Sequence, residues 1–166
     1  MPSLKTQLKS RLAKAKRIVI LGVGSELRGD DVAGMLVVKT LKKSLSGNKK
    51  IVPIKIIFGG VSPENFTGAI KRFKPSHLVI IDSADLGRKA GTVDFLDVQN
   101  IGGVTFNTHK LPTRFMVEYL LVSEKFSVTI IGIQPKTISF MAPVSQQAKK
   151  AVGSLAGTLK SILTHQ

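Results

Sequence analysis

Two neighbouring carboxylates, Asp30 and Asp31, follow a glycine-rich turn that begins at Gly22. The turn comes directly after the apolar run 18–21, so the acids stand where a strand would lead into a helix. A phosphate-binding loop at such a place offers backbone N–H groups and a lysine to an anion. Carboxylates there instead attract a cation or exchange protons with a substrate. The residue types therefore indicate a metal-directed or acid–base site and argue against a nucleotide site.

Three further groups could join this pair. Asp82 ends the apolar run 77–81, Asp85 follows it, and His109 lies in a later predicted loop. Ligands of an open parallel sheet bind beyond the carboxyl ends of the strands, where the strand order reverses, so these residues can meet at one edge. Two carboxylates and an imidazole suit Zn²⁺, Ni²⁺ or Mn²⁺. Three protein ligands with open positions are typical of a catalytic or sensing site.

Each of these residues also has an ordinary structural interpretation. Asp31 could cap the following helix, because Asp is favoured at helix N-termini. Asp82 could hold a loop through backbone hydrogen bonds, and His109 could be a loop histidine without a special role. A shared site is favoured because all three groups fall at the predicted edge of the sheet.

Alternating strands and helices are predicted by the spacing of apolar residues. Strands are expected at 17–23, 50–58, 77–81, 92–98 and 127–133, and helices at 2–16, 31–45, 63–73, 112–125 and 145–163. This order indicates a mostly parallel sheet covered on both faces. We expect one α/β domain over 1–166, a three-layer αβα sandwich around a roughly five-stranded twisted sheet. Pro53 favours an edge position for the second strand.

The composition excludes several classes of protein and site. Without cysteine, the chain has no disulfide, thiolate metal ligand or cysteine nucleophile. No apolar run approaches the roughly 18 residues of a membrane span, and no secretory signal is visible, so a cytoplasmic protein is expected. The net charge of +15 is spread along the chain and comes with one Tyr and no Trp. Solubility or attraction to an acidic partner is therefore favoured over nucleic-acid binding.

Known catalytic and nucleotide-binding motifs do not fit. Leu27 occupies the third glycine position of a dinucleotide fingerprint, and Asp30 stands where a phosphate-binding loop needs lysine. Neither G-x-S-x-G nor H-E-x-x-H occurs.

Four ordered segments carry a resemblance to a known family. They read GVGSELRGDD at 22–31, GGVSPEN at 59–65, IIDSADLG at 80–87 and THKLP at 108–112. With GIQP at 132–135, the chain resembles the nickel–iron hydrogenase maturation endopeptidases, in particular the HycI type, from residue 17 to about 165. The basic predicted helix over 1–16 lies outside this resemblance.

The resemblance implies a specific activity and a set of site residues. Members of the family remove a C-terminal extension from the hydrogenase large-subunit precursor after nickel insertion. Carried over to this chain, metal contact falls to Asp31, Asp82 and His109, with Asp31 and Asp82 as ligand or general base. The nickel is expected to arrive with the substrate, and no permanent organic cofactor is expected. Apart from the resemblance, a monomer is expected, because the sequence shows no heptad pattern or long exposed apolar stripe that would indicate a dimer. Asp30, Asp85 and Glu64 are secondary candidates.

This chain departs from the family pattern at three positions. Ser25 stands where the family usually has Asn, and Val32 where it usually has Gly. Phe58 stands where an acid often ends the second strand. A mechanism that needs an acid at that position would not apply here.

Two other functions remain as alternatives. A non-catalytic metal-binding α/β module would bind metal through the same triad and leave the precursor intact. A basic nucleic-acid or anion-binding domain would bind with steep salt dependence and would be indifferent to Asp31→Asn.

Overall fold

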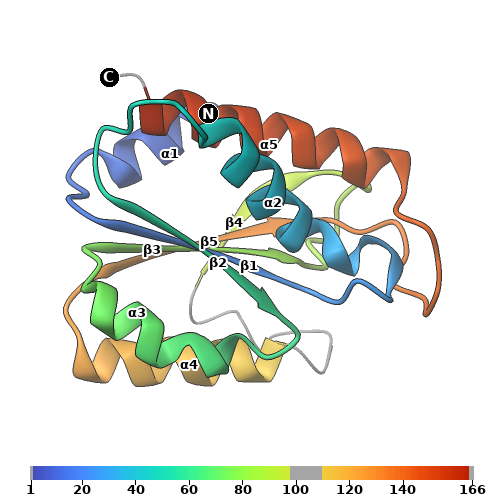
Figure 1. Cartoon of the computed structure of the whole chain (residues 1–166). Coiled ribbons are helices and arrows are strands. Elements are labelled where there is room, and N and C mark those ends of the chain that lie inside the picture. The colour runs from blue at the N-terminus through green and yellow to red at the C-terminus, as the bar shows by residue number, and fades with distance from the viewer. Residues whose placement is uncertain (1, 98–109, 165–166) are drawn as a thin grey trace.

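A computed structural model of the chain describes residues 2–97 and 110–164, and it shows a five-stranded sheet between two layers of helices (Figure 1). The elements are α1 (Leu4–Leu12), β1 (Ile18–Val23), η1 (Gly29–Val32), α2 (Ala33–Leu45), β2 (Ile54–Gly60), η2 (Pro63–Phe66), α3 (Thr67–Phe73), β3 (His77–Ser83), β4 (Val93–Leu96), α4 (Lys110–Ser123), β5 (Ser127–Ile133) and α5 (Gln146–Thr164). The elements η1 and η2 are 3₁₀ helices. The predicted α/β sandwich is confirmed.

The strands lie in the order β2-β1-β3-β5-β4. Neighbouring strands are parallel, except that β4 runs antiparallel to β5. β1 and β3 lie in the middle and are buried along their whole lengths, as their uninterrupted apolar sequences predict. The chain passes from β1 to β2 on one side and then returns to β3 on the other. The strand order therefore reverses between β1 and β3, where a ligand site is expected.

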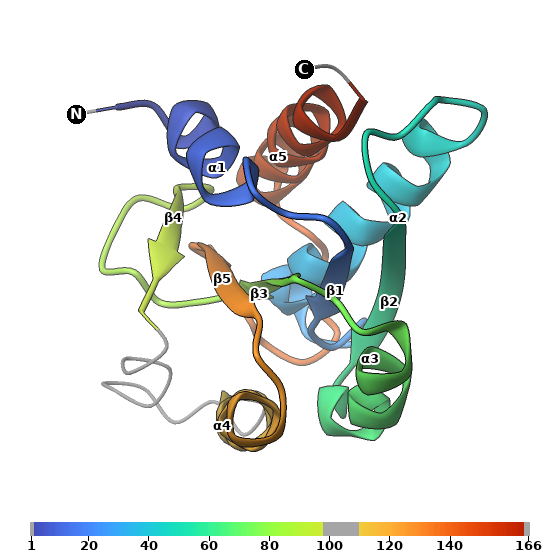
Figure 2. The ribbon, with the colours of Figure 1, turned by 90° about the vertical axis from the view of Figure 1, so that its left-hand side faces the viewer.

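The two helical layers cover opposite faces of the sheet. Figure 2 shows α1, α2 and α5 on one face and α3 and α4 on the other. Side chains alternate accordingly: Ile18 and Ile20 of β1 pack with α2 and α5, whereas Val19 and Leu21 pack with α3 and α4. Because both faces are packed, the carboxyl ends of β1 and β3 are held at fixed positions.

The N-terminal helix α1 is part of the packed domain. Its Leu8 and Leu12 are buried in the same core as α2 and α5, and Ser3 caps it by accepting a hydrogen bond from the Thr6 N–H at 3.2 Å. Among the described residues, no helix combines the length and the apolar character that crossing a membrane requires.

The second strand differs from its predicted range of 50–58. It begins only at Ile54, because the Ile51 N–H donates to the Leu163 carbonyl of α5 at 3.0 Å and so leaves the sheet. Gly59 and Gly60 continue the strand beyond its predicted end at residue 58. The edge position predicted from Pro53 is confirmed.

Helix boundaries also shift: the helix predicted over 2–16 spans only Leu4–Leu12, and the one predicted over 63–73 is divided into η2 and α3. The predicted helix over 31–45 is divided into the 3₁₀ helix η1 and the α-helix α2, so Asp31 lies before α2 and not within it. The helix expected from Pro112 begins already at Lys110.

Candidate functional site

The turn after β1 folds back on Asp31. Gly24 has φ of 135°, and a side chain there would collide with the backbone carbonyl of Asp31. The turn is closed by two hydrogen bonds: the Asp31 N–H donates to the Arg28 carbonyl at 3.0 Å, and the Ser25 N–H donates to Asp31 Oδ2 at 2.9 Å. Asp31 is only 4% exposed. The carboxylate is thus held in one orientation at the end of β1.

Asp31 does not cap α2. The N-cap residue of α2 is Val32, and no side chain caps that helix end. The capping interpretation of Asp31 is therefore wrong, and its carboxylate is instead directed at the turn that precedes it.

Two glycines bring this turn next to the end of β3. A side chain at Gly34 would overlap the carbonyl oxygens of Ile81 and Val23, and one at Gly22 would lie 2.5 Å from the Gly34 carbonyl. Only glycine permits this approach of α2 to β1 and β3. It places η1 against β3, in which Asp82 directly follows Ile81.

Asp82 lies at the carboxyl end of β3, beside the point where the strand order reverses. It is 7% exposed. Strand alternation puts it on the same face as Leu78 and Ile80, which pack with α3 and α4. Asp31 therefore follows β1 and Asp82 lies at the end of β3, and these two strands are neighbours in the sheet.

His109, the third predicted metal ligand, lies outside the described residues. It directly precedes Lys110, the first residue of α4, and α4 covers the face that Asp82 shares. Among residues 2–97 and 110–164, no group of three or more His, Asp or Glu side chains could hold a metal ion.

Asp30 has a structural role. Its carboxylate accepts hydrogen bonds of 2.7 Å from the Lys136 N–H, the Ser145 N–H and the Ser145 hydroxyl. Burial raises the pKa of Asp30, but these bonds outweigh burial and hold the pKa below its ordinary value. As a secondary candidate for ligand or base, Asp30 is therefore disfavoured, since its oxygens join η1 to the segment between β5 and α5.

Asp85 and Gln134 organise the loop after β3. Gln134 Oε1 accepts hydrogen bonds from the Leu86 N–H at 2.6 Å and the Arg88 N–H at 3.3 Å, and its Nε2 donates to Asp85 Oδ1 at 3.3 Å. Asp85 Oδ1 also accepts from the Gly87 N–H at 3.1 Å. Sequence reasoning gave Gln134 no role, although it lies in the GIQP segment. Glu64, the other secondary candidate, is exposed on η2.

Phe58 is the residue at which the resemblance leads us to expect an acid. It pairs with Gly22 across the β1–β2 ladder and packs, partly buried, against the core beneath α2. The Lys42 ammonium lies 5.4 Å from the centre of its ring. The aromatic ring thus fills this position with an apolar and cation–π environment, which gives no support to a third carboxylate ligand on β2.

The fold and the paired strand-end carboxylates define an α/β protein with a candidate hydrolytic or metal-directed site. The family model described as hydrogenase maturation protease, HycI, matches residues 35–162. The match includes Asp82 and begins after Asp31. A putative hydrogenase maturation protease of Methanocaldococcus jannaschii is 37% identical over 163 residues, which is 96% of each chain. The hydrogenase 3 maturation protease of Escherichia coli K12 is 32% identical over 135 residues, 81% of this chain and 83% of that protein.

A solved structure gives the same result. The crystal structure of the [NiFe] hydrogenase maturation protease HycI from Thermococcus kodakarensis superposes with a TM-score of 0.85 at 30% identity, covering 96% of this chain and 99% of the other. The chain therefore belongs to the HycI family of hydrogenase maturation proteases, and its class is that of peptidases.

Proposed function

We propose that this protein is an endopeptidase that removes the C-terminal extension of a [NiFe]-hydrogenase large-subunit precursor and recognises nickel already bound to that substrate. The family supports the reaction class. The observation that carries the proposal to particular residues is the position of Asp31 and Asp82, two nearly buried carboxylates at the ends of neighbouring strands where the strand order reverses.

The chemistry is amide hydrolysis by water. A carboxylate accepts a proton from the water as its oxygen attacks the scissile carbonyl carbon. The proton then passes to the leaving amine as the C–N bond breaks, which yields a carboxylate and an amine. The substrate's nickel would polarise the carbonyl or hold the peptide in place.

The two carboxylates are equipped for different parts of this task. The hydrogen bond from the Ser25 N–H fixes one oxygen of Asp31, which favours a role as an oriented ligand or base. Asp82 faces α4, and His109 immediately precedes that helix in the sequence. We propose that Asp31, Asp82 and His109 together contact the nickel of the substrate.

The test is the mass of the cognate precursor after incubation with this protein, with and without nickel loaded. We expect nickel-dependent loss of a C-terminal peptide by the wild type. We expect Asp31→Asn and Asp82→Asn to lower the rate about 100-fold or more. Asp94→Asn, on the exposed part of β4, is the matched control and should cut normally.

Two outcomes would count against the proposal. A nickel-loaded precursor that stays intact here, but is cut by a known maturation peptidase, would indicate a binding protein without this activity. If both Asp31→Asn and Asp82→Asn cut the precursor at the wild-type rate, the assignment of these two carboxylates to the active site is wrong. Melting temperatures of the variants show whether they are folded. Asp31→Asn is expected to fold, because its amide oxygen can still accept the hydrogen bond from the Ser25 N–H.

A further inference from the structure

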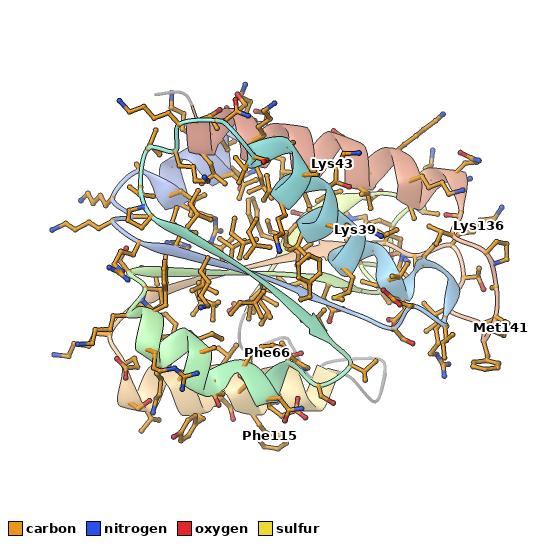
Figure 3. The ribbon with its side chains drawn as sticks, viewed as in Figure 1. Lys39, Lys43, Phe66, Phe115, Lys136 and Met141 are labelled. Carbon is orange, nitrogen blue, oxygen red and sulfur yellow. The ribbon has the colours of Figure 1, made fainter. Side chains whose placement is uncertain are left out.

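Two loops beside the candidate site carry exposed apolar side chains. Leu27 is 56% exposed in the turn after β1, and Phe140 and Met141 are 68% and 70% exposed in the segment between β5 and α5. We call these three residues the apolar rim. Figure 3 shows Met141 and Lys136 at the end of the molecule where η1 leads into α2. Clusters of solvent-exposed large apolar side chains often mark an interaction surface.

The apolar rim is tied to the turn that holds Asp31. The Met141 N–H donates to the Leu27 carbonyl at 2.7 Å, and the Asp30 N–H donates to the Thr137 carbonyl at 2.9 Å. A side chain at Gly29 would lie 2.6 Å from that same carbonyl, so the two loops are in close backbone contact. A molecule bound at the rim would therefore lie next to Asp31 and against a fixed surface.

The backbone at Met141 adopts an unfavourable conformation. Its φ is 60°, in the left-handed region that glycine and asparagine enter more readily than methionine. The hydrogen bond to Leu27 holds this conformation in place. The exposed side chain of Met141 contributes little to the hydrophobic core, so its strained backbone is not explained by folding stability. A role in binding beside the turn that holds Asp31 explains it better.

The charges around the rim indicate the character of the partner. Two exposed cations, Arg28 and Lys136, lie beside it against one exposed carboxylate, Glu26, and the whole chain has a net charge of +15. A second copy of this chain would bring two strongly positive surfaces together, which is unfavourable. An apolar segment flanked by acidic side chains would satisfy both the rim and its charged neighbours.

We propose that the apolar rim is the surface on which the large-subunit precursor docks, through an apolar segment with acidic neighbours, so that its C-terminal extension reaches Asp31. This inference rests on the proposed function and adds to it the docking surface and the chemistry of the segment that binds there.

The first test is a double variant, Phe140→Gln with Met141→Asn, in which asparagine tolerates the positive φ. The substrate is the nickel-loaded precursor, and the readout is steady-state kinetics by mass spectrometry. We expect KM to rise about tenfold while kcat stays within about twofold, because binding is lost but the carboxylates are untouched. Val122→Gln, at a residue 90% exposed near the end of α4, is the matched control and should leave KM unchanged.

The second test concerns the charges. Arg28→Gln with Lys136→Gln should raise KM and flatten its dependence on ionic strength, because screened attraction to acidic groups contributes to docking. Both side chains are exposed, so melting temperatures close to that of the wild type are expected and would show that folding is intact.

The outcomes separate this inference from the function on which it rests. If the wild type cuts the precursor and the Phe140/Met141 variant has the KM of Val122→Gln, the docking surface is wrong and the function stands. If kcat falls while KM is unchanged, the rim acts on the carboxylates and does not dock the substrate. If sedimentation shows wild-type dimers that the variant lacks, the rim is a self-association surface. If the wild type does not cut the precursor, the function and this inference fail together.

Discussion

The turns that follow β1 and β2 have similar backbones and opposite surroundings. Each leads from a parallel strand into a 3₁₀ helix, and the residues that precede these helices, Arg28 and Ser62, have nearly the same φ and ψ, −129° and 61° against −133° and 62°. The first turn carries Glu26, Asp30 and Asp31, and the second carries Glu64. All four residues of η1 are buried, however, whereas Glu64 of η2 is exposed.

Packing from distant segments explains this difference. The first turn is held between the glycine contacts of α2 with β1 and β3 and the segment after β5, which contributes Thr137 and Ser145. The second turn lies at the edge strand of the sheet. A local conformation therefore does not by itself make a site; the site depends on what the rest of the chain places around that conformation.

The largest effect is expected at the glycine that brings α2 onto the strands. Gly34→Ala should lower the free energy of unfolding by about 4 kcal/mol, since the new methyl group meets two backbone carbonyls that cannot move aside independently. Gly153→Ala is the control: nothing lies within 4 Å of its added methyl group in α5, so stability should rise by about 0.5–1 kcal/mol. Both free energies of unfolding are measured by urea denaturation. If Gly34→Ala changes stability as little as Gly153→Ala does, the close contact of α2 with β1 and β3 does not hold the first turn in place.

His77, at the amino end of β3, is a buried titratable side chain with a side-chain hydrogen bond to Thr129, and it tests how burial changes a pKa. Its Nε2 and Thr129 Oγ1 are hydrogen-bonded at 2.8 Å, and burial, together with the positive charge of Arg11, lowers its pKa to about 4. The unfolded state takes up the proton first as pH falls from 6.5 to about 4, so stability is lost through this window, by about 3 kcal/mol in total. Denaturation at several pH values checks this.

The matched variant for this prediction is His77→Gln, which keeps a hydrogen-bonding group for Thr129 but does not titrate. Its stability should change less between pH 6.5 and 4 than that of the wild type. If the free energies of unfolding of the two proteins change in parallel with pH, the loss of stability is not due to protonation of His77.

Asp30 is the opposite of His77: it is buried, but hydrogen-bond donors stabilise its charged form. Asp30→Asn should lower the free energy of unfolding at pH 7 by about 2 kcal/mol, because the amide group cannot accept all the hydrogen bonds from Lys136 and Ser145. The pKa of Asp30 lies below its ordinary 3.8, so its contribution is complete above that pH and is lost as pH falls through the lowered pKa. The gap between variant and wild type should therefore narrow in strong acid; a gap that is constant with pH would exclude a role for the charge.

The smallest effect is expected in the second turn. Glu64→Gln should change stability by less than about 0.5 kcal/mol and leave precursor cleavage within about twofold, because Glu64 is exposed on η2. A loss comparable to that of Asp30→Asn in the same denaturation series would show that the two turns are more alike than their burial suggests.

Some of the site followed from local sequence alone. Uninterrupted apolar runs identified β1 and β3 as central strands, and the residues that follow each run are fixed by chain connectivity, so Asp31 and Asp82 could be placed at one edge. Ser145 caps α5 by accepting a hydrogen bond from the Ala148 N–H at 3.1 Å, as is typical of a serine that precedes a helix. The metal-ligand prediction for His109 remains a prediction, since that residue lies outside the described part of the chain.

The sequence by itself determined the alternation of elements and the acids at the strand ends, because periodicity and connectivity are local properties. Only the tertiary structure decided that Asp30 is a structural carboxylate while Asp31 is directed at the turn. The donors to Asp30 come from Lys136 and Ser145, more than 100 positions away. The apolar rim is likewise a product of folding, because a hydrogen bond between Met141 and Leu27 joins two segments that no local pattern connects.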